Sequence, residues 1–248
     1  MLKTAEGIVI RSIDYGEGNK IITLFTKENG KVGLMVRGAK KVRSRHAAVT
    51  QLFTHAQFDF YKSGQMGSLN AAEIINAFQS IREDLYTAAY TSYMAEMVDR
   101  MVGDSEGSAF LFGQFSGGLA ALDEGKDMQI VTHVFELKML AFGGYMPVLE
   151  VCVSCGRTEG GMAFSAAMGG IVCPLCRGKD LSAIPLAEGS WKLLKLLAQV
   201  DIRRLGRIEV KESTRQQLKQ CIQGCIDHYI GIRWKSRSVL DQLEKYKP

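Results

Sequence analysis

The fold is decided near the start of the chain, by residues 7–37, which read GIVIRSIDYGEGNKIITLFTKENGKVGLMVR. Three runs rich in β-branched and aromatic residues are separated by turn sequences at Gly16-Glu17-Gly18 and Asn29-Gly30, which predicts strands joined by hairpins. Two further runs, 58–62 and 69–75, follow with no helical pattern between them. Five short antiparallel strands predict a small Greek-key barrel, because closure removes exposed strand edges. An OB-fold is the first candidate, and an SH3-like barrel would give nearly the same pattern.

After about residue 77 the apolar period changes from two to four. The residues that recur every fourth position are Ile81, Leu85, Ala89, Tyr93, Met97 and Met101. This spacing predicts one long amphipathic helix whose apolar face packs against a partner. Further helices are expected at 108–122, 129–142, 186–200 and 214–231.

The expected fold class is therefore α+β with more than one domain. We expect a nucleic-acid-binding OB-fold domain at residues 1–79 and an all-helical domain at residues 80–248. A Gly-rich and Cys-rich stretch at about residues 150–180 interrupts the helical pattern. It predicts an insert that needs a cross-link of its own to be stable.

Two CxxC pairs in this insert have the spacing of a four-cysteine zinc ribbon. They are Cys152 with Cys155 and Cys173 with Cys176. Each pair can place two thiolates on one Zn²⁺, and four thiolates leave no open position for water. We therefore expect a structural metal that folds the insert. Disulfides are rare in the cytoplasm, and a redox motif would need only one pair. Cys221 and Cys225 are expected in the core of a helix.

The link after the third strand is strongly basic. Residues 37–45 carry five positive charges, and no acidic residue occurs between Glu28 and Asp59. A basic loop on a barrel, beside aromatic side chains, can follow a phosphate backbone and stack bases without reading sequence. The neighbouring aromatic residues are Phe53, Phe58, Phe60 and Tyr61. The alternative is a solvated loop whose aromatic neighbours fill the barrel core. A weaker basic run follows Arg233, where we expect Trp234 to pack against a helix rather than stack on a base.

Composition and charge narrow the classes of function. Of 248 residues, 46% are apolar and 23% charged, which is typical of a globular protein. The longest uncharged stretch, residues 160–176, is interrupted by Gly, Ser and Pro, so no membrane span is expected. Glu6, Arg11 and Asp14 come too early for the apolar region of a secretory leader. Residues 1–80 and 203–248 have a net positive charge and residues 81–202 a net negative one, which suggests a polyanion-binding end and a separate acidic body. No phosphate-binding loop or GxSxG motif is present, and we expect a binding protein rather than an enzyme.

The sequence also resembles a known family. The similarity is densest over residues 1–45, which include Glu6-Gly7-Ile8-Val9-Ile10-Arg11-Ser12 and Arg37-Gly38-Ala39-Lys40-Lys41, and over residues 136–178, which include Gly144-Tyr145-Met146-Pro147 and the first CxxC pair. In these segments the chain resembles the RecO family of bacterial recombination mediators.

The resemblance implies an OB-fold, a helical domain, a structural zinc and a role in recombinational repair. Family members bind and anneal single-stranded DNA, bind double-stranded DNA, and help the recombinase displace single-strand-binding protein. The implied partners are the acidic C-terminal tail of single-strand-binding protein and a ring-forming mediator of the RecR family. Carried onto this chain, the DNA surface would comprise Lys31 as a lesser candidate with Arg37, Lys40, Lys41, Arg43 and Arg45.

Two other readings of the sequence remain open. A zinc-ribbon and OB-fold RNA-binding factor would use the same basic loop, and only the 2′-hydroxyl would distinguish its ligand. A metal-dependent hydrolase is disfavoured by a closed set of four cysteines. The expected location is the cytoplasm, in association with the nucleoid.

Overall fold

The computed structural model describes residues 1–64, 66–104 and 106–245. The chain forms two compact units. Unit 1 contains Met1–Gly125 together with the C-terminal segment from Trp234 onward, and unit 2 contains Lys126–Arg233. Both ends of the chain therefore belong to the same unit.

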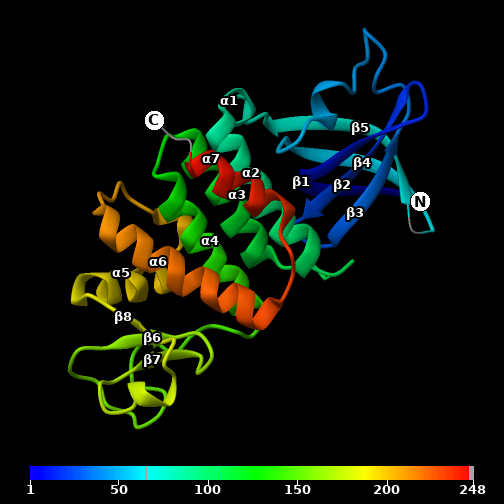
Figure 1. The fold of residues 1–248 in the computed structure, drawn as a ribbon. Helices are drawn as coiled ribbons and strands as arrows, with labels where there is room; N and C mark the ends of the chain where they lie inside the picture. Colours follow the sequence, from blue (N-terminus) through cyan, green and yellow to red (C-terminus); the bar gives the residue numbers. More distant parts are fainter. Residues whose placement is uncertain (65, 105, 246–248) are drawn as a thin grey trace. The chain divides into compact units, whose positions relative to one another are not determined.

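Unit 1 is built on a closed five-stranded barrel in the order β1-β2-β3-β5-β4 (Figure 1). The pair β3–β5 is parallel and the other neighbours are antiparallel, with β1 pairing β4 to close the barrel. This is the strand order of an OB-fold, and it decides between the two barrels that the sequence pattern allowed. The strands are β1 (Leu2–Tyr15), β2 (Asn19–Thr26), β3 (Gly30–Val36), β4 (His55–Ser63) and β5 (Met66–Asn76).

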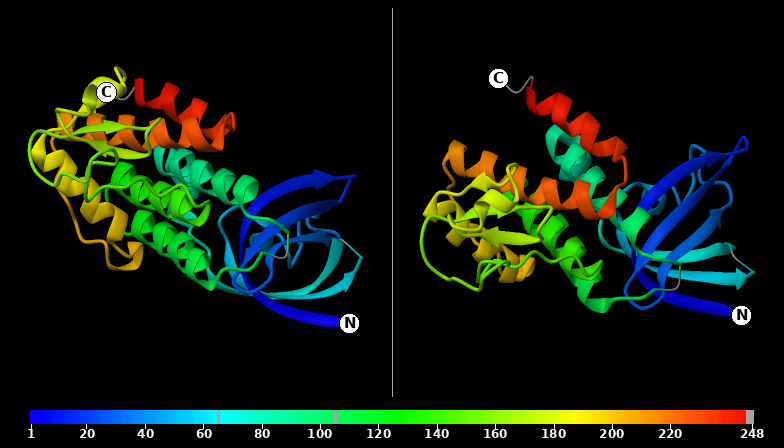
Figure 2. Two further views of the ribbon diagram at one scale, coloured as in Figure 1. Left: turned by 90° about the horizontal axis from the view of Figure 1, so that it is seen from below. Right: turned by 60° about the horizontal axis from the view of Figure 1, so that its bottom comes forward.

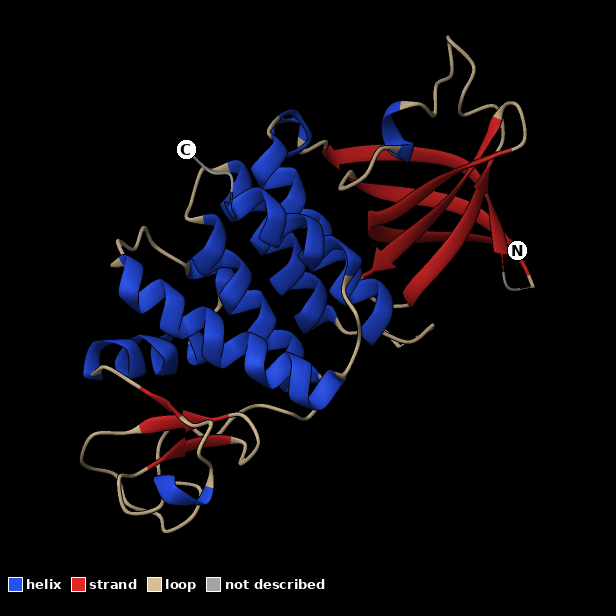
Figure 3. Cartoon of the chain, viewed as in Figure 1, coloured by secondary structure: helices blue, strands red, loops and turns tan. Residues whose placement is uncertain are grey.

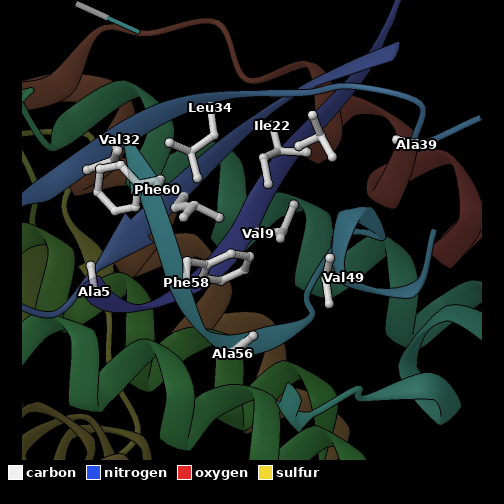
Figure 4. Close-up of a cluster of buried hydrophobic side chains, with 12 residues drawn as sticks. Ala5, Val9, Ile22, Val32, Leu34, Ala39, Val49, Ala56, Phe58 and Phe60 are labelled. Atoms are coloured by element: carbon white, nitrogen blue, oxygen red, sulfur yellow. The ribbon is translucent and has the colours of Figure 1, made fainter. Parts of the chain in front are cut away.

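The inside of the barrel is filled by alternate residues of each strand. Ile22, Leu34, Phe58 and Phe60 meet in this core (Figure 4) and are almost completely buried. Such alternation is what the period-two pattern predicts. Glycine fits at position 67, where a Cβ would lie 2.6 Å from a methyl group of Leu34 and would force that side chain to shift in the packed core.

The outer face of β1 and β2 is also apolar, because helices cover it. Ile8 and Phe25 are fully buried although they lie outside the barrel core. The ring of Phe25 lies 5.7 Å from that of Phe112 and 6.0 Å from that of Phe115. Both partners belong to α3 (Ala109–Asp123). This second buried face explains why residues 7–10 are a continuous apolar run and not an alternating one.

The prediction of one long helix after residue 77 is wrong in one respect, because this segment forms two helices. α1 (Gln79–Glu83) ends at Asp84, whose extended backbone starts α2 (Leu85–Met101). The Asp84 carboxylate accepts a hydrogen bond from the Thr87 N–H at 2.7 Å and caps the second helix. Ile81 and Tyr93 are both buried. The four-residue apolar period therefore continues across the break, and the sequence pattern does not reveal it.

A further helix, α7 (Lys235–Lys245), returns from unit 2 to pack along α2, as Figures 1 and 2 show in red. Trp234 is buried, and its ring meets that of Tyr93 edge-on at 6.1 Å. The expectation that Trp234 packs against a helix is confirmed. The helix itself was not predicted.

Unit 2 is helical and carries the insert as a small three-stranded sheet, whose strands are drawn in red in Figure 3. The sheet has the order β7-β6-β8, and a 3₁₀ turn, Arg177–Lys179, follows Cys176, the last cysteine of the insert. Cys221 and Cys225 are buried in a helix core, as expected. No described helix is long and apolar enough to cross a membrane. The elements are α4 (Met128–Phe142), β6 (Ala163–Ser165), β7 (Gly170–Val172), β8 (Ile184–Pro185), α5 (Glu188–Gln199) and α6 (Glu212–Cys225), which continues as a π-turn (Ile226–Ile230).

Candidate nucleic-acid interface and metal centre

The basic loop, residues 37–45, is anchored at its start to the turn between β1 and β2. The Gly38 N–H donates to Asn19 Oδ1 at 2.9 Å, and the Lys40 N–H donates to the Gly18 carbonyl at 3.1 Å. Ala39 is buried in the barrel core cluster. These contacts fix the base of the loop, while the tip, marked by Val42, is fully exposed.

The five basic side chains of this loop are exposed, and they differ in what holds them. Lys40 Nζ lies 2.8 Å from Asp14, and this hydrogen bond lowers the pKa of the Asp14 carboxyl. Arg45 Nε donates to His46 Nε2 at 3.1 Å. In the described part of the chain, Lys41 and Arg43 have no ion-pair partner, and Arg37 likewise has none. The side chains of Arg37, Lys41, Arg43 and Arg45 are available to phosphate. The Lys40 ammonium is held by Asp14 and must leave that carboxylate to bind one.

Lys31, the sixth predicted residue, has a different environment. Its side chain is only 16% exposed, and its ammonium lies 3.7 Å from the Asp99 carboxylate. It also donates to the Asp99 carbonyl, near the C-terminal end of α2. A cation at that end is favoured by the helix dipole. Through these contacts with Asp99, Lys31 holds β3 against α2.

The predicted aromatic neighbours of the loop divide between core and surface. Phe53, Phe58 and Phe60 are buried, so they cannot stack bases, whereas Tyr61 is 52% exposed. The structure adds Tyr15, which is 53% exposed at the end of β1. Tyr15 pairs with Asn19, the residue that anchors the loop. Its place directly before Gly16, at a turn, was the sequence signal that could have identified it.

A partly exposed and mostly apolar row runs round the barrel from this turn, with Ile21, Met35 and Ser68 half-buried. The strand registers connect Ile13 to Ile21, Ile21 to Met35, Met35 to Ser68, Ser68 to Tyr61 and Tyr61 to Leu2. Ile13, Tyr61 and Leu2 are each more than 40% exposed. This row provides an apolar surface beside a basic loop, a combination that suits bases and phosphates together.

The four predicted cysteines of unit 2 converge. All four sulfur atoms lie within 4.8 Å of one another, and those of Cys155 and Cys173 are 3.6 Å apart. Four thiolates about 2.3 Å from one ion would be separated by about 3.8 Å. The turn of the first pair is closed by the Gly156 N–H, which donates to the Cys152 carbonyl at 2.8 Å. The cluster can therefore hold a metal ion.

The cysteines of this cluster differ in how easily they ionise, because backbone amides favour a thiolate and neighbouring thiols oppose a second one. Burial opposes ionisation of Cys152, but amides that include that of Cys173 donate to its sulfur and lower its pKa to about 6. The amide of Arg157 favours a Cys155 thiolate, and the neighbouring thiols outweigh it and raise the pKa of Cys155 to about 11. In contrast to Cys152, Cys225 in α6 is affected mainly by burial, which raises its pKa to about 12. Soft thiolate ligands in a closed set of four match Zn²⁺.

Comparison with known proteins finds a family model that matches each of the two parts of the chain. The family model described as recombination protein O N terminal matches residues 1–78, and that described as recombination protein O C terminal matches residues 82–238. The chain belongs to the RecO family. Proteins named DNA repair protein RecO are 42% identical to it in Halalkalibacterium halodurans, over 98% of this chain and 96% of the relative, and 41% identical in Bacillus subtilis, over 100% and 97%. A third, from Listeria monocytogenes, is 39% identical over 99% and 96%.

The predicted residues of this RecO-family chain thus fall into three groups. The four cysteines form one cluster, and the five residues of the basic loop form one exposed segment. Lys31 stands apart from both, because its ammonium is held by α2.

Proposed function

We propose that this RecO-family chain is a recombination mediator that binds and anneals single-stranded DNA and helps load the recombinase onto strands coated by single-strand-binding protein. The observation that carries the proposal is the exposed basic loop on a closed OB-type barrel, beside the exposed rings of Tyr15 and Tyr61. The family and the repair role in its relatives' names support it.

The proposed chemistry needs no hydrolysis. Two complementary strands repel each other through their phosphates, and the loop cations reduce this repulsion and release counterions. Base pairing then provides the driving force. Residues 1–79 act as the DNA-binding domain, with Arg37, Lys40, Lys41, Arg43 and Arg45 on phosphates. Lys31 contributes less, because its ammonium is already held by Asp99.

The remaining parts of the proposal concern the rest of the chain. Residues 80–248 form the helical domain, and the insert at about 150–180 holds one structural Zn²⁺ through its four cysteines. The tail of single-strand-binding protein and the RecR-family ring are the protein partners. The protein works in the cytoplasm at the nucleoid.

The test is annealing of complementary strands precoated with single-strand-binding protein, in the absence of nucleotide. We expect acceleration by the full chain and a large loss in the variant Arg37→Ala/Lys41→Ala/Arg43→Ala. The matched control, Lys3→Ala/Lys192→Ala/Arg207→Ala, removes the same charge from exposed positions elsewhere. If both variants lose the same share of annealing activity, the loss follows from net charge alone, and the loop is rejected as the DNA-binding site.

Two further readouts separate this function from its alternatives. With about five phosphate contacts, log K against log salt should have a slope of roughly −3.5 on single strands, and the loop variant should lower its magnitude by about 2. Matched RNA and DNA strands should compete equally or in favour of DNA. A strong preference for RNA, with no annealing of coated DNA, would replace the mediator with an RNA-binding factor.

A further inference from the structure

Unit 1 contains a cavity of about 380 Å³ that neither the basic loop nor the barrel core accounts for. It lies between the 3₁₀ turn Ala48–Thr50, which ends the β3–β4 connection, and α1. This volume is at the lower end of the range of small-molecule sites, about 300–1,000 Å³. The residues that line it are Ala48, Gln51, Ala77, Gln79, Arg82 and Glu83.

Arg82 is held in place on one side and open on the other. Its Nη1 donates to the carbonyls of Leu52 and Ala77. These two bonds use both hydrogens of Nη1 and fix the plane of the guanidinium. Among the described residues, no carboxylate forms an ion pair with Arg82, and Nε and Nη2 remain for a ligand. A guanidinium fixed by two carbonyls loses little freedom when it binds two acceptors.

Both walls of this cavity are held by strained backbone. Phe53 (φ 69°) and Phe78 (φ 44°) are the non-glycine residues with positive φ in the described chain. Phe53 follows Leu52, whose carbonyl binds Arg82, and Phe78 lies between Ala77 and Gln79 of the lining. Both side chains are buried, which keeps the strained conformations in place. Such strain tends to occur where a site must be held in a fixed geometry.

The lining selects a ligand with two kinds of hydrogen-bonding edge. Glu83 offers a carboxylate that only accepts, although its Oε1 already accepts from the Gln79 amide at 2.6 Å, and Arg82 offers N–H groups that only donate. Guanine has both matching edges, since O6 and N7 accept and the Watson–Crick edge donates from N1 and N2. Adenine and thymine each lack the paired donors for a carboxylate. The amide of Gln51 can donate or accept and so complete either edge, whereas Gln79 Nε2 already donates to Glu83.

We propose that this cavity binds one guanine base, turned out of the DNA strand whose phosphates lie on the basic loop. The inference rests on the proposed function, because the strand is brought there by the loop. The chain connects the two sites closely: Ala47 N–H donates to the Ser44 carbonyl, and Ala48 follows Arg45 by three residues. The loop then supplies affinity for any sequence, and the cavity adds a preference for one base.

The experiment measures binding of the full chain to three labelled 15-mers at one salt concentration by fluorescence anisotropy. One is all dT, one has a single central dG, and one has a single central dA. We expect the dG strand to bind about fivefold more tightly than the other two, at the lower end of what a base-edge pair provides. Equal affinity for all three, with normal binding, would overturn the cavity and leave the proposed function intact. Failure to bind any of them would reject the proposed function itself.

Two variants locate the preference. Ala48→Phe fills the cavity without removing a hydrogen-bonding group, and we expect it to abolish the preference for dG while dT affinity stays within twofold. The control Ala71→Phe adds the same ring at an exposed position on β5 and should leave the preference unchanged. Glu83→Gln should reduce the preference by removing the acceptor pair for N1 and N2. A dG preference that survives Ala48→Phe would place base recognition elsewhere and overturn the inference.

Discussion

At the scale of single residues, one barrel shows how environment gives the same side chain different uses. Lys31 and Lys41 are both lysines on the β3 side of the barrel, ten positions apart. Lys31 is largely buried against the end of α2 and contacts Asp99, whereas Lys41 is exposed in the basic loop. Sequence alone groups them by charge. Their contacts separate a structural cation from one that is open to a ligand.

The first prediction uses this contrast. Lys31→Ala should lower the free energy of unfolding by about 1–2 kcal/mol, because it removes a hydrogen bond and an ion pair that are mostly shielded from water. Its affinity for single-stranded DNA should stay within about twofold. Lys41→Ala should do the reverse, with stability unchanged within about 0.5 kcal/mol and a salt slope smaller by about 0.7. Urea unfolding and anisotropy titrations on the same preparations check both, and matching profiles for the two variants would contradict the assignment.

The second prediction concerns the cysteines. Cys155→Ser should reduce bound zinc from about one ion per chain to well below half, since a hydroxyl is a poor fourth ligand for Zn²⁺. Metal analysis after gel filtration measures this. Cys225→Ala is the matched control, because Cys225 is buried in α6 away from the cluster. Equal zinc in Cys155→Ser and the unmodified chain would show that the cluster is not the metal site.

At the scale of elements, the break between α1 and α2 depends on one cap. Asp84→Ala should lower the free energy of unfolding by about 1 kcal/mol, because the Thr87 amide loses its acceptor. Asp84→Asn should retain most of this stability, since an asparagine oxygen can also cap. Chemical unfolding followed by circular dichroism compares them. If the two substitutions cost the same, charge and not capping determines the stability at this position.

The elements also show which features the sequence could predict. The five strands and the insert followed from β-branched runs, Asn29-Gly30 and the CxxC spacing, because these are local signals. The break at Asp84 was missed because Ile81 and Leu85 keep a four-residue period across it, although an Asp before a helical run is itself a start signal. α7 was missed because it has few apolar residues, although those few lie on one face of the helix. Its position comes from long-range contacts of Trp234 and Glu96 that no local pattern encodes.

The fourth prediction concerns α7 and acid. The Glu96 carboxylate accepts hydrogen bonds from the Lys235 and Ser236 amides, 3.1 and 2.8 Å away, at the start of α7. Burial alone would raise the pKa of Glu96, but these bonds and that from the Ser236 hydroxyl lower it below the usual value of a glutamate. A carboxyl with a depressed folded pKa contributes its stability above its unfolded pKa. That contribution, about 2 kcal/mol, is lost as pH falls below about 4.5 and through the folded pKa.

Trp234 reports this release once the other tryptophan is replaced. In a Trp191→Phe background, the emission of Trp234 should shift to longer wavelength in acid as its ring leaves Tyr93. Glu96→Gln should show part of this shift already at neutral pH and a much smaller change in acid. An acid transition of unchanged size in Glu96→Gln would assign the release to another group.

At the scale of the whole molecule, the basic and acidic segments of the chain do not form separate units. The sequence suggested a separate acidic body, yet the acidic segment, residues 81–125, has two Lys/Arg against eight Asp/Glu and belongs to unit 1 with the barrel. Unit 2, Lys126–Arg233, has fourteen against ten. The basic C-terminal run returns to unit 1 as α7. The basic loop therefore owes its positive character to its own residues and not to a basic half of the molecule.

The division into units leads to the last prediction, on metal removal. The cysteine cluster lies in unit 2, and the barrel core lies in unit 1, so each has its own buried cluster. Because metal binding and folding of a four-cysteine site are coupled, chelation should unfold residues 150–180 and give an earlier thermal transition. Affinity for naked single-stranded DNA should stay within about twofold, since its proposed contacts are in unit 1. Hydrogen exchange and anisotropy, followed in parallel during chelation, test this. Loss of DNA binding in proportion to zinc loss would mean that the insert supports the DNA surface, and the two units would then have to be treated as one functional body.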